Sequence, residues 1–182
     1  MRGTMDPILY NAEKYELLHA ELFWLSETMK PLSKGWDGKY DRYCQWAQFK
    51  DRATQKVFYV FNTHLDHKGE IARREGAKLI LAQIAKIAKD APVFVVGDMN
   101  SKDDTGAYQS FTSVLKDSRA VAPQKKGPEG TAHNFGRVAP VRIDYIFTNE
   151  PVKIQQYVVD DESYPNGFYP SDHYLVYVHA SF

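Results

Sequence analysis

The chain has 182 residues, 43% hydrophobic and 14% aromatic, which excludes a disordered protein and is enough to build a sizeable core. Its 23 basic residues balance its 23 acidic residues, which excludes a global positive field that recruits nucleic acid, and its single cysteine, Cys44, cannot form an internal disulfide. No apolar run approaches the roughly 20 residues of a membrane span, and the N-terminus lacks the apolar region of a signal peptide, so a cytoplasmic location is expected by default.

Strand-like patterns dominate the first third of the chain. The expected strands are Ile8–Tyr10, Tyr15–Ser26, Tyr43–Lys50 and Lys56–Thr63. The segment Pro31–Tyr40 contains Ser33, Gly35 and Gly38 and is expected to be a loop.

The middle of the chain contains the strongest helical pattern. From Glu70 to Lys89, apolar residues recur at helical spacing and form one apolar face. Ala91–Gly97 is a continuous apolar run ended by glycine, which is typical of a strand buried on both faces. A shorter helix is expected over Gly106–Leu115.

The last third is predicted to return to strands. Ala122–Arg137 carries two prolines and three glycines and is expected to be a surface loop, and the strands that follow are Arg142–Asn149, Val152–Asp160 and Tyr174–Ala180. No repeat or linker interrupts the sequence, so residues 1–182 are predicted to form one α/β (α+β) domain with more strand than helix.

Four short segments near the expected strand ends carry most of the side chains suited to phosphate chemistry. They are Asn62-Thr63-His64, Gly97-Asp98-Met99-Asn100, Arg142-Ile143-Asp144-Tyr145 and Ser171-Asp172-His173. Strand ends can bring residues that are distant in sequence into one cleft. Together the segments supply three carboxylates, two histidines and two amides, a set that indicates metal-dependent hydrolysis.

Each segment also has a structural interpretation. Asp98 and Asn100 point to the same side of an extended segment and suit a hard cation or an attacking water, but Asp and Asn are also common in turns. Asp172 and His173 suit a metal ligand beside an acid or base, but they could equally cap a strand. Asp144 lies in an apolar strand and needs a partner, for which Arg142 and His173 are both candidates.

His64 allows two functional interpretations besides a structural one. In one, it acts with the other three segments. In the other, Asn62-x-His64-x-Asp66-His67 is one residue away from the zinc signature of the metallo-β-lactamase fold. The zinc interpretation leaves Asp98, Asn100, Asp144 and the Asp172-His173 pair without a role, so it is the minor alternative.

Taken in order, the motifs Asn-Thr-His-Leu, Gly-Asp-x-Asn, Ile-Asp-Tyr-Ile-Phe and Ser-Asp-His resemble the C-terminal signatures of the endonuclease/exonuclease/phosphatase superfamily. Phe23–Thr28 and Gly35-Trp36-Asp37 look like a bacterial branch of it, and the resemblance runs from about Pro7 onward. It implies the fold of DNase I, a two-sheet β-sandwich flanked by helices, and a nuclease, phosphodiesterase or phosphatase activity on a nucleic acid, phospholipid headgroup or small phosphoester.

The resemblance also implies roles for matching residues. Asp98 would activate the attacking water, and Asn100 would hold the water or the phosphoryl oxygens. His173, fixed by Asp144, would contact the phosphate, and His64 would donate a hydrogen bond to it. The expected metal ligands are Asp172, Asp98 and Asn100, and the cation is Mg²⁺ or Mn²⁺. Arg42, His133 and Phe135 are candidates for substrate binding.

One departure from the family pattern affects these expectations. Relatives begin with a strand bearing an Asn and then a Gln-Glu pair whose Glu binds Mg²⁺, and neither motif is found upstream of Ile8. The chain is therefore expected to correspond to the C-terminal two-thirds of such an enzyme without its N-terminal strands, to bind Mg²⁺ weakly unless Glu27 or Asp66 replaces the ligand, and to associate with another copy or a partner. The alternative function is a weak or inactive module that binds phosphate ligands.

Overall fold

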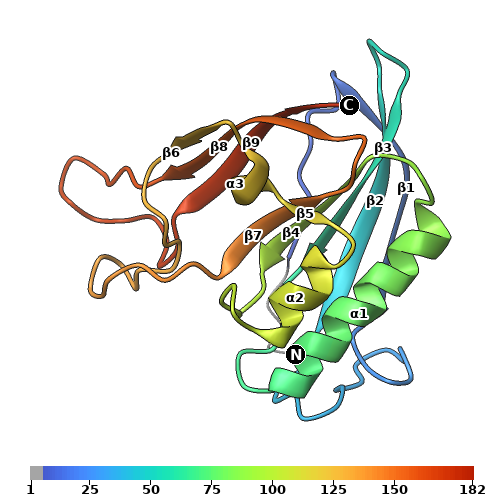
Figure 1. Cartoon of the computed structure of the whole chain (residues 1–182), viewed down its shortest axis with the longest axis horizontal. Helices are drawn as coiled ribbons and strands as arrows, with labels where there is room; N and C mark the ends of the chain where they lie inside the picture. The colour runs from blue at the N-terminus through green and yellow to red at the C-terminus, as the bar shows by residue number, and fades with distance from the viewer. Residues whose placement is uncertain (1–5) are drawn as a thin grey trace.

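Two β-sheets and three helices make up the structure, a computed structural model that describes residues 6–182 (Figure 1). The larger sheet has six strands in the order β1-β2-β3-β4-β7-β5. Its strands are β1 (Tyr15–Trp24), β2 (Tyr43–Asp51), β3 (Val57–Thr63), β4 (Val93–Asp98), β5 (Lys116–Asp117) and β7 (Asp144–Thr148). The smaller sheet has the order β6-β8-β9 and consists of β6 (Gln124–Lys126), β8 (Lys153–Asp160) and β9 (Leu175–Ser181).

Helices α1 (Glu70–Ile87) and α2 (Gly106–Thr112) cover one face of the larger sheet, and the short α3 (Ser118–Val121) follows β5 (Figure 1). The start of α1 is capped from outside the helix, because the Asp37 carboxylate accepts the N–H of Ala72 at 2.7 Å. The helix ends before Lys89, whose φ of +52° is left-handed.

Side chains of β3 alternate between two apolar layers. Tyr59 and Phe61 belong to the cluster under α1, which also contains Ile80, whereas Phe58 points to the opposite layer and packs against Phe182 beyond the end of β9. The core therefore fills the space between the helices and the larger sheet, and a second apolar layer joins the two sheets.

The two-sheet sandwich expected from the sequence is confirmed, with differences of one to three residues at several element ends. One strand prediction is wrong. Ile8–Tyr10 is not a strand, because no strand within residues 6–182 pairs with it, and Leu9 is 89% exposed. The predicted loop 122–137 begins with β6, which pairs in parallel with β8. Within residues 6–182, no helix is long and apolar enough to cross a membrane.

Candidate active site

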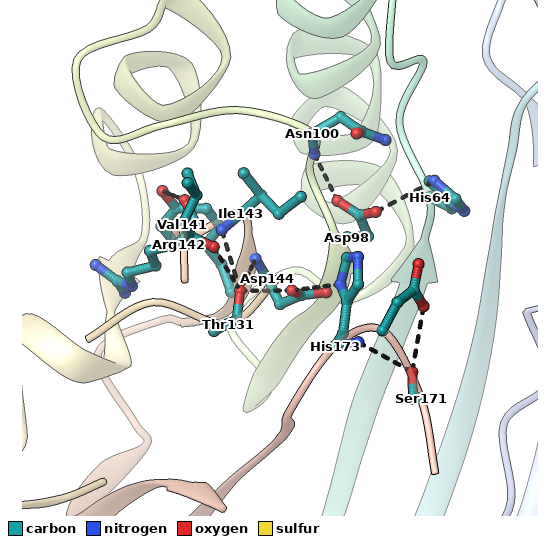
Figure 2. Close-up of polar contacts among 12 residues, drawn as sticks. His64, Asp98, Asn100, Thr131, Val141, Arg142, Ile143, Asp144, Ser171 and His173 are labelled. Atoms are coloured by element: carbon teal, nitrogen blue, oxygen red, sulfur yellow. Dashed lines mark hydrogen bonds and ion pairs between the residues drawn. The ribbon is translucent and has the colours of Figure 1, made fainter. Parts of the chain in front are cut away.

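Four polar segments meet where strands of the larger sheet end (Figure 2). Asp98 is the last residue of β4 and Asp144 is the first residue of the antiparallel β7, and the two are register partners. His64 directly follows β3, which runs parallel to β4, and His173 lies two residues before β9. The topology thus gathers side chains separated by up to 109 positions, from His64 to His173, into one site.

Gly97 brings the ends of β3 and β4 unusually close together. Its φ is +134°, and a Cβ at this position would lie 1.9 Å from the carbonyl oxygen of Thr63. Beyond it, Leu65 N–H donates to the Asp98 carbonyl at 2.9 Å, and the Asn100 side-chain amide donates to the Leu65 carbonyl at 2.9 Å. This junction holds His64 Nε2 at 3.3 Å from Asp98 Oδ2.

The partner of Asp144 is His173. Its Nδ1 lies 2.8 Å from Asp144 Oδ2, and the two side chains are only 27% and 19% exposed. Arg142, the other candidate, turns away and donates to Asp117 at 2.6 Å with its guanidinium 4.4 Å from the ring of Tyr145. Asp144 and His173 therefore form a carboxylate–histidine pair.

Burial and neighbouring charges shift the pKa values of three of these groups. Burial, with the negative charge of Asp144, raises the pKa of Asp98 to about 6. Burial, with the positive charge of Arg42, lowers the pKa of His64 to about 4. The hydrogen bond to Asp144 raises the pKa of His173. At neutral pH, Asp98 is thus mainly ionised while His64 is neutral.

A cation could be held at the centre of this site. One oxygen or nitrogen atom from each of Asp98, Asp144 and His173 lies within 4.8 Å of the others. Two carboxylates and an imidazole fit a divalent ion. Asp172 is outside this group. It is exposed, and its carboxylate oxygen lies 3.4 Å from the Ser171 hydroxyl, so its metal role remains a prediction.

The predicted substrate residues have different environments. Arg42 directly precedes β2 and is close enough for its charge to affect both His64 and Asp98. Phe135 is 51% exposed and has a left-handed φ of +56°. His133 is only 1% exposed, because it stacks on Tyr174 with ring centroids 3.8 Å apart. The His133 ring therefore lies inside the loop and supports it, and its role in substrate binding stays a prediction.

Asp66 is also a structural residue. Its two carboxylate oxygens accept four backbone N–H groups, from Lys39, Tyr40, Lys68 and Gly69, at 2.8–2.9 Å. Both oxygens are engaged and the residue is 3% exposed, so it cannot serve as the metal ligand that either the zinc interpretation or the replacement hypothesis requires. Glu27 likewise accepts the N–H of Trp36 with both oxygens.

Sequence reasoning missed Thr131. This buried residue donates its hydroxyl hydrogen to Asp144 at 2.6 Å (Figure 2). A threonine in a loop rich in glycine and proline has no periodicity or spacing that would single it out. The signal that could have indicated it is indirect, namely the need of the buried Asp144 for hydrogen-bond donors.

Comparisons with known proteins show the family of this chain. A family model described as the endonuclease/exonuclease/phosphatase family matches residues 22–173. A member of that family from Bacteroides vulgatus has a crystal structure that is 36% identical with a TM-score of 0.90, covering 94% of this chain and 68% of the other. A mannosyl-6-phosphatase from Bacteroides thetaiotaomicron VPI-5482 is 34% identical with a TM-score of 0.87, covering 95% and 69%. An uncharacterised protein of Acanthamoeba polyphaga mimivirus is 24% identical over 184 residues, covering 94% and 68%.

Proposed function

The chain belongs to the endonuclease/exonuclease/phosphatase family, and we propose that it is a metal-dependent hydrolase of phosphoester bonds. One observation carries the proposal. Asp98, with a pKa of about 6, and the Asp144–His173 pair lie together where β4 ends and β7 begins. The arrangement offers a base and an imidazole oriented by a carboxylate within one partly buried site.

Asp98 is proposed as the general base. A carboxylate with a pKa of about 6 is mainly ionised at pH 7 and still basic enough to accept a proton from water that attacks phosphorus. Asn100 follows in a left-handed turn and donates its backbone N–H to Asp98 at 2.7 Å. In the proposal, the Asn100 side chain holds the water or a phosphoryl oxygen.

The two histidines are proposed to stabilise the phosphoryl group. His173 uses Nδ1 for Asp144, which leaves Nε2 free. In the charged form of the ring, which the raised pKa favours, Nε2–H donates to a phosphoryl oxygen, and in the neutral form with its hydrogen on Nδ1 the same nitrogen can bind the metal. His64 is neutral at pH 7 and donates a hydrogen bond to another phosphoryl oxygen without adding charge. Arg42 contributes a positive charge close to both His64 and Asp98.

The metal proposed for this site is Mg²⁺ or Mn²⁺. Asp98, Asp144 and His173 would hold it, with Asn100 and Asp172 as further proposed ligands from the adjoining loops. When bound, the cation neutralises charge on the phosphoryl oxygens.

The proposed substrate is a small phosphoester. The balanced charge of the chain argues against long duplex DNA, because binding it requires several phosphates to be neutralised together. The 34% identical relative is described as a mannosyl-6-phosphatase, which makes a sugar phosphate the first candidate. The exposed Phe135 ring is proposed to contact the group that carries the phosphate.

A second copy of the chain is proposed to cover the free edge of β9. Among residues 6–182, β9 pairs only with β8, and Leu175 on β9 is 64% exposed. An open cavity of about 330 Å³ beside it is lined partly by Val96, Ile146 and Val176. Free strand edges and apolar faces are usually covered. This association would be contradicted if sedimentation showed only a monomer and that monomer bound no hydrophobic dye.

The activity is tested with chromogenic phosphomonoesters and phosphodiesters and with mannose 6-phosphate, in Mg²⁺ or Mn²⁺. Asp98→Asn and His173→Ala should each lose about 10²-fold or more of the parent turnover. The exposed Asp90→Asn is the matched carboxylate control and should keep it. Equal turnover by parent, Asp98→Asn and His173→Ala would remove the catalytic proposal.

The alternative is a module that binds phosphate ligands without turning them over. Two observations motivate it. The positive charge of Arg42 beside His64 would attract a phosphate, and the possible metal group within residues 6–182 contains only two carboxylates. Calorimetric titration with inorganic phosphate separates the two functions. Tight binding without metal, combined with no turnover when metal is added, would favour the binding module.

A further inference from the structure

Thr131 lies in the loop that leads from β6 to β7 and is completely buried. Its hydroxyl oxygen has four polar neighbours. They are Asp144 Oδ2 at 2.6 Å, the backbone nitrogens of Ile143 and Asp144, each at 3.2 Å, and the Val141 carbonyl oxygen at 3.3 Å. This is a dense set of contacts for one hydroxyl next to the proposed active site (Figure 2).

The chemistry of a hydroxyl determines the direction of these bonds. It has one hydrogen to donate and two lone pairs to accept with. The N–H groups of Ile143 and Asp144 occupy the lone pairs, so the single hydrogen goes to an oxygen acceptor. Asp144 Oδ2 is 0.7 Å closer than the Val141 carbonyl and carries negative charge, so it receives the hydrogen.

The same carboxylate oxygen binds His173. Asp144 Oδ2 accepts from the Thr131 hydroxyl at 2.6 Å and lies 2.8 Å from His173 Nδ1. A carboxylate held by one donor can rotate about its terminal bond, whereas two donors on one oxygen fix its plane. We propose that Thr131 is a positioning residue that orients Asp144 and thereby keeps the neutral His173 in the tautomer with its hydrogen on Nδ1.

Thr131 is itself fixed to the two segments that precede β7 and β9. Its N–H donates to the Val141 carbonyl at 3.0 Å, close to the start of β7, and its carbonyl accepts the N–H of Tyr174 at 2.8 Å, next to His173. The next residue, Ala132, forms isolated antiparallel β-bridges with both Val141 and His173. The hydroxyl therefore has a rigid base from which to hold Asp144, and this role deepens the proposed phosphoesterase function on which it rests.

The test uses the full chain with three single variants. Thr131→Val keeps the shape but removes the hydroxyl, and Thr131→Ser keeps the hydroxyl. Thr148→Val is the matched control, because Thr148 lies on β7, is fully buried, and its hydroxyl has no hydrogen-bond partner among the described residues. Thermal unfolding confirms that each variant is folded before it is compared.

In the metal-free protein, the nitrogen NMR shifts of neutral His173 should show the Nδ1–H form in the parent, Thr131→Ser and Thr148→Val. Thr131→Val should show a mixture with the Nε2–H form. In turnover assays, Thr131→Val should lower kcat about tenfold with KM unchanged, and Thr131→Ser should restore most of it. In an Asp144→Ala background, Thr131→Val should have no further effect on kcat.

Two results would overturn the positioning role. One is a parent-like His173 tautomer in folded Thr131→Val, and the other is a loss of kcat that adds fully to that of Asp144→Ala. A parent that turns over no phosphoester would instead refute the proposed function, and the tautomer measurement would still decide the role of Thr131.

Discussion

Asp98 and Asp144 face each other as register partners, where the antiparallel strands β4 and β7 end and begin. Two carboxylates that are both largely buried repel each other, and each of the two has a different set of hydrogen-bond partners that compensates its charge. Asp144 is hydrogen-bonded by the Thr131 hydroxyl and the His173 imidazole. Asp98 accepts a hydrogen bond from the Asn100 backbone N–H and lies beside the neutral imidazole of His64. Asp98 is the less compensated carboxylate, and burial together with the charge of Asp144 raises its pKa.

The first prediction is an inverted order of titration. In the metal-free protein, the Asp98 carboxyl should titrate near pH 6 and the His64 imidazole near pH 4, because burial penalises the charged form of each. Carbon NMR of the Asp98 carboxyl and proton NMR of the His64 ring measure both. Asp144→Asn should lower the pKa of Asp98 by removing the neighbouring charge. Titration of His64 above Asp98 would contradict the prediction.

The second prediction is that the ionised Asp98 carboxylate lowers the free energy of unfolding. Its folded pKa of about 6 is above the ordinary value of 3.8, so the cost is fully present above about pH 6 and disappears as the pH falls below 3.8. Asp98→Asn should therefore raise the free energy of unfolding at pH 7 by about 1–3 kcal/mol, and the gain should shrink toward pH 4. Urea denaturation across this pH range measures it.

Asp90→Asn is the control for the stability prediction. Asp90 is exposed beyond the end of α1, so its substitution should leave the free energy of unfolding within about 0.5 kcal/mol of the parent. A less stable Asp98→Asn protein at pH 7 would show that the contacts of the Asp98 carboxylate outweigh its burial cost.

Most of the fold could be predicted from local patterns. The apolar spacing of residues 70–89 indicated α1, and the run before Gly97 indicated a buried strand. Ile8–Tyr10 has the composition of a strand but is not one, since strand formation requires a pairing partner that local composition does not reveal. Helix α3 and strand β6 are too short to produce a periodic signal.

The site could be predicted only in part. The strand-end positions of His64, Asp98, Asp144 and His173 were readable, but the choice between Arg142 and His173 as the partner of Asp144 depends on tertiary packing. The burial of His133 could not be predicted, because a glycine-rich loop indicates exposure, whereas its ring packs against Tyr174. Such contacts between loops are not encoded by spacing along the chain.

The third prediction concerns Gly97. Gly97→Ala should destabilise the protein by more than about 3 kcal/mol, because its Cβ would meet the Thr63 carbonyl at 1.9 Å and its φ is +134°. Gly167→Ala is the matched control. Gly167 also has a positive φ, of +80°, but nothing lies within 4 Å of its Cβ, so it should cost only about 1 kcal/mol. Equal losses of stability in denaturant unfolding would show that close approach at Gly97 is unimportant.

The last prediction concerns the choice of metal. The group formed by Asp98, Asp144 and His173 contains one nitrogen and only two carboxylates, so it should bind Mn²⁺ more tightly than Mg²⁺, which prefers oxygen ligands and keeps its waters. His173→Ala should weaken Mn²⁺ binding about tenfold and Mg²⁺ binding less, as measured by calorimetry and by the electron paramagnetic resonance of free Mn²⁺. His179→Ala, at an exposed position of β9, should leave both affinities unchanged. Tight Mg²⁺ binding, or Mn²⁺ binding that is insensitive to His173→Ala, would place the metal on other ligands, with Asp172 and Asn100 the first to be substituted.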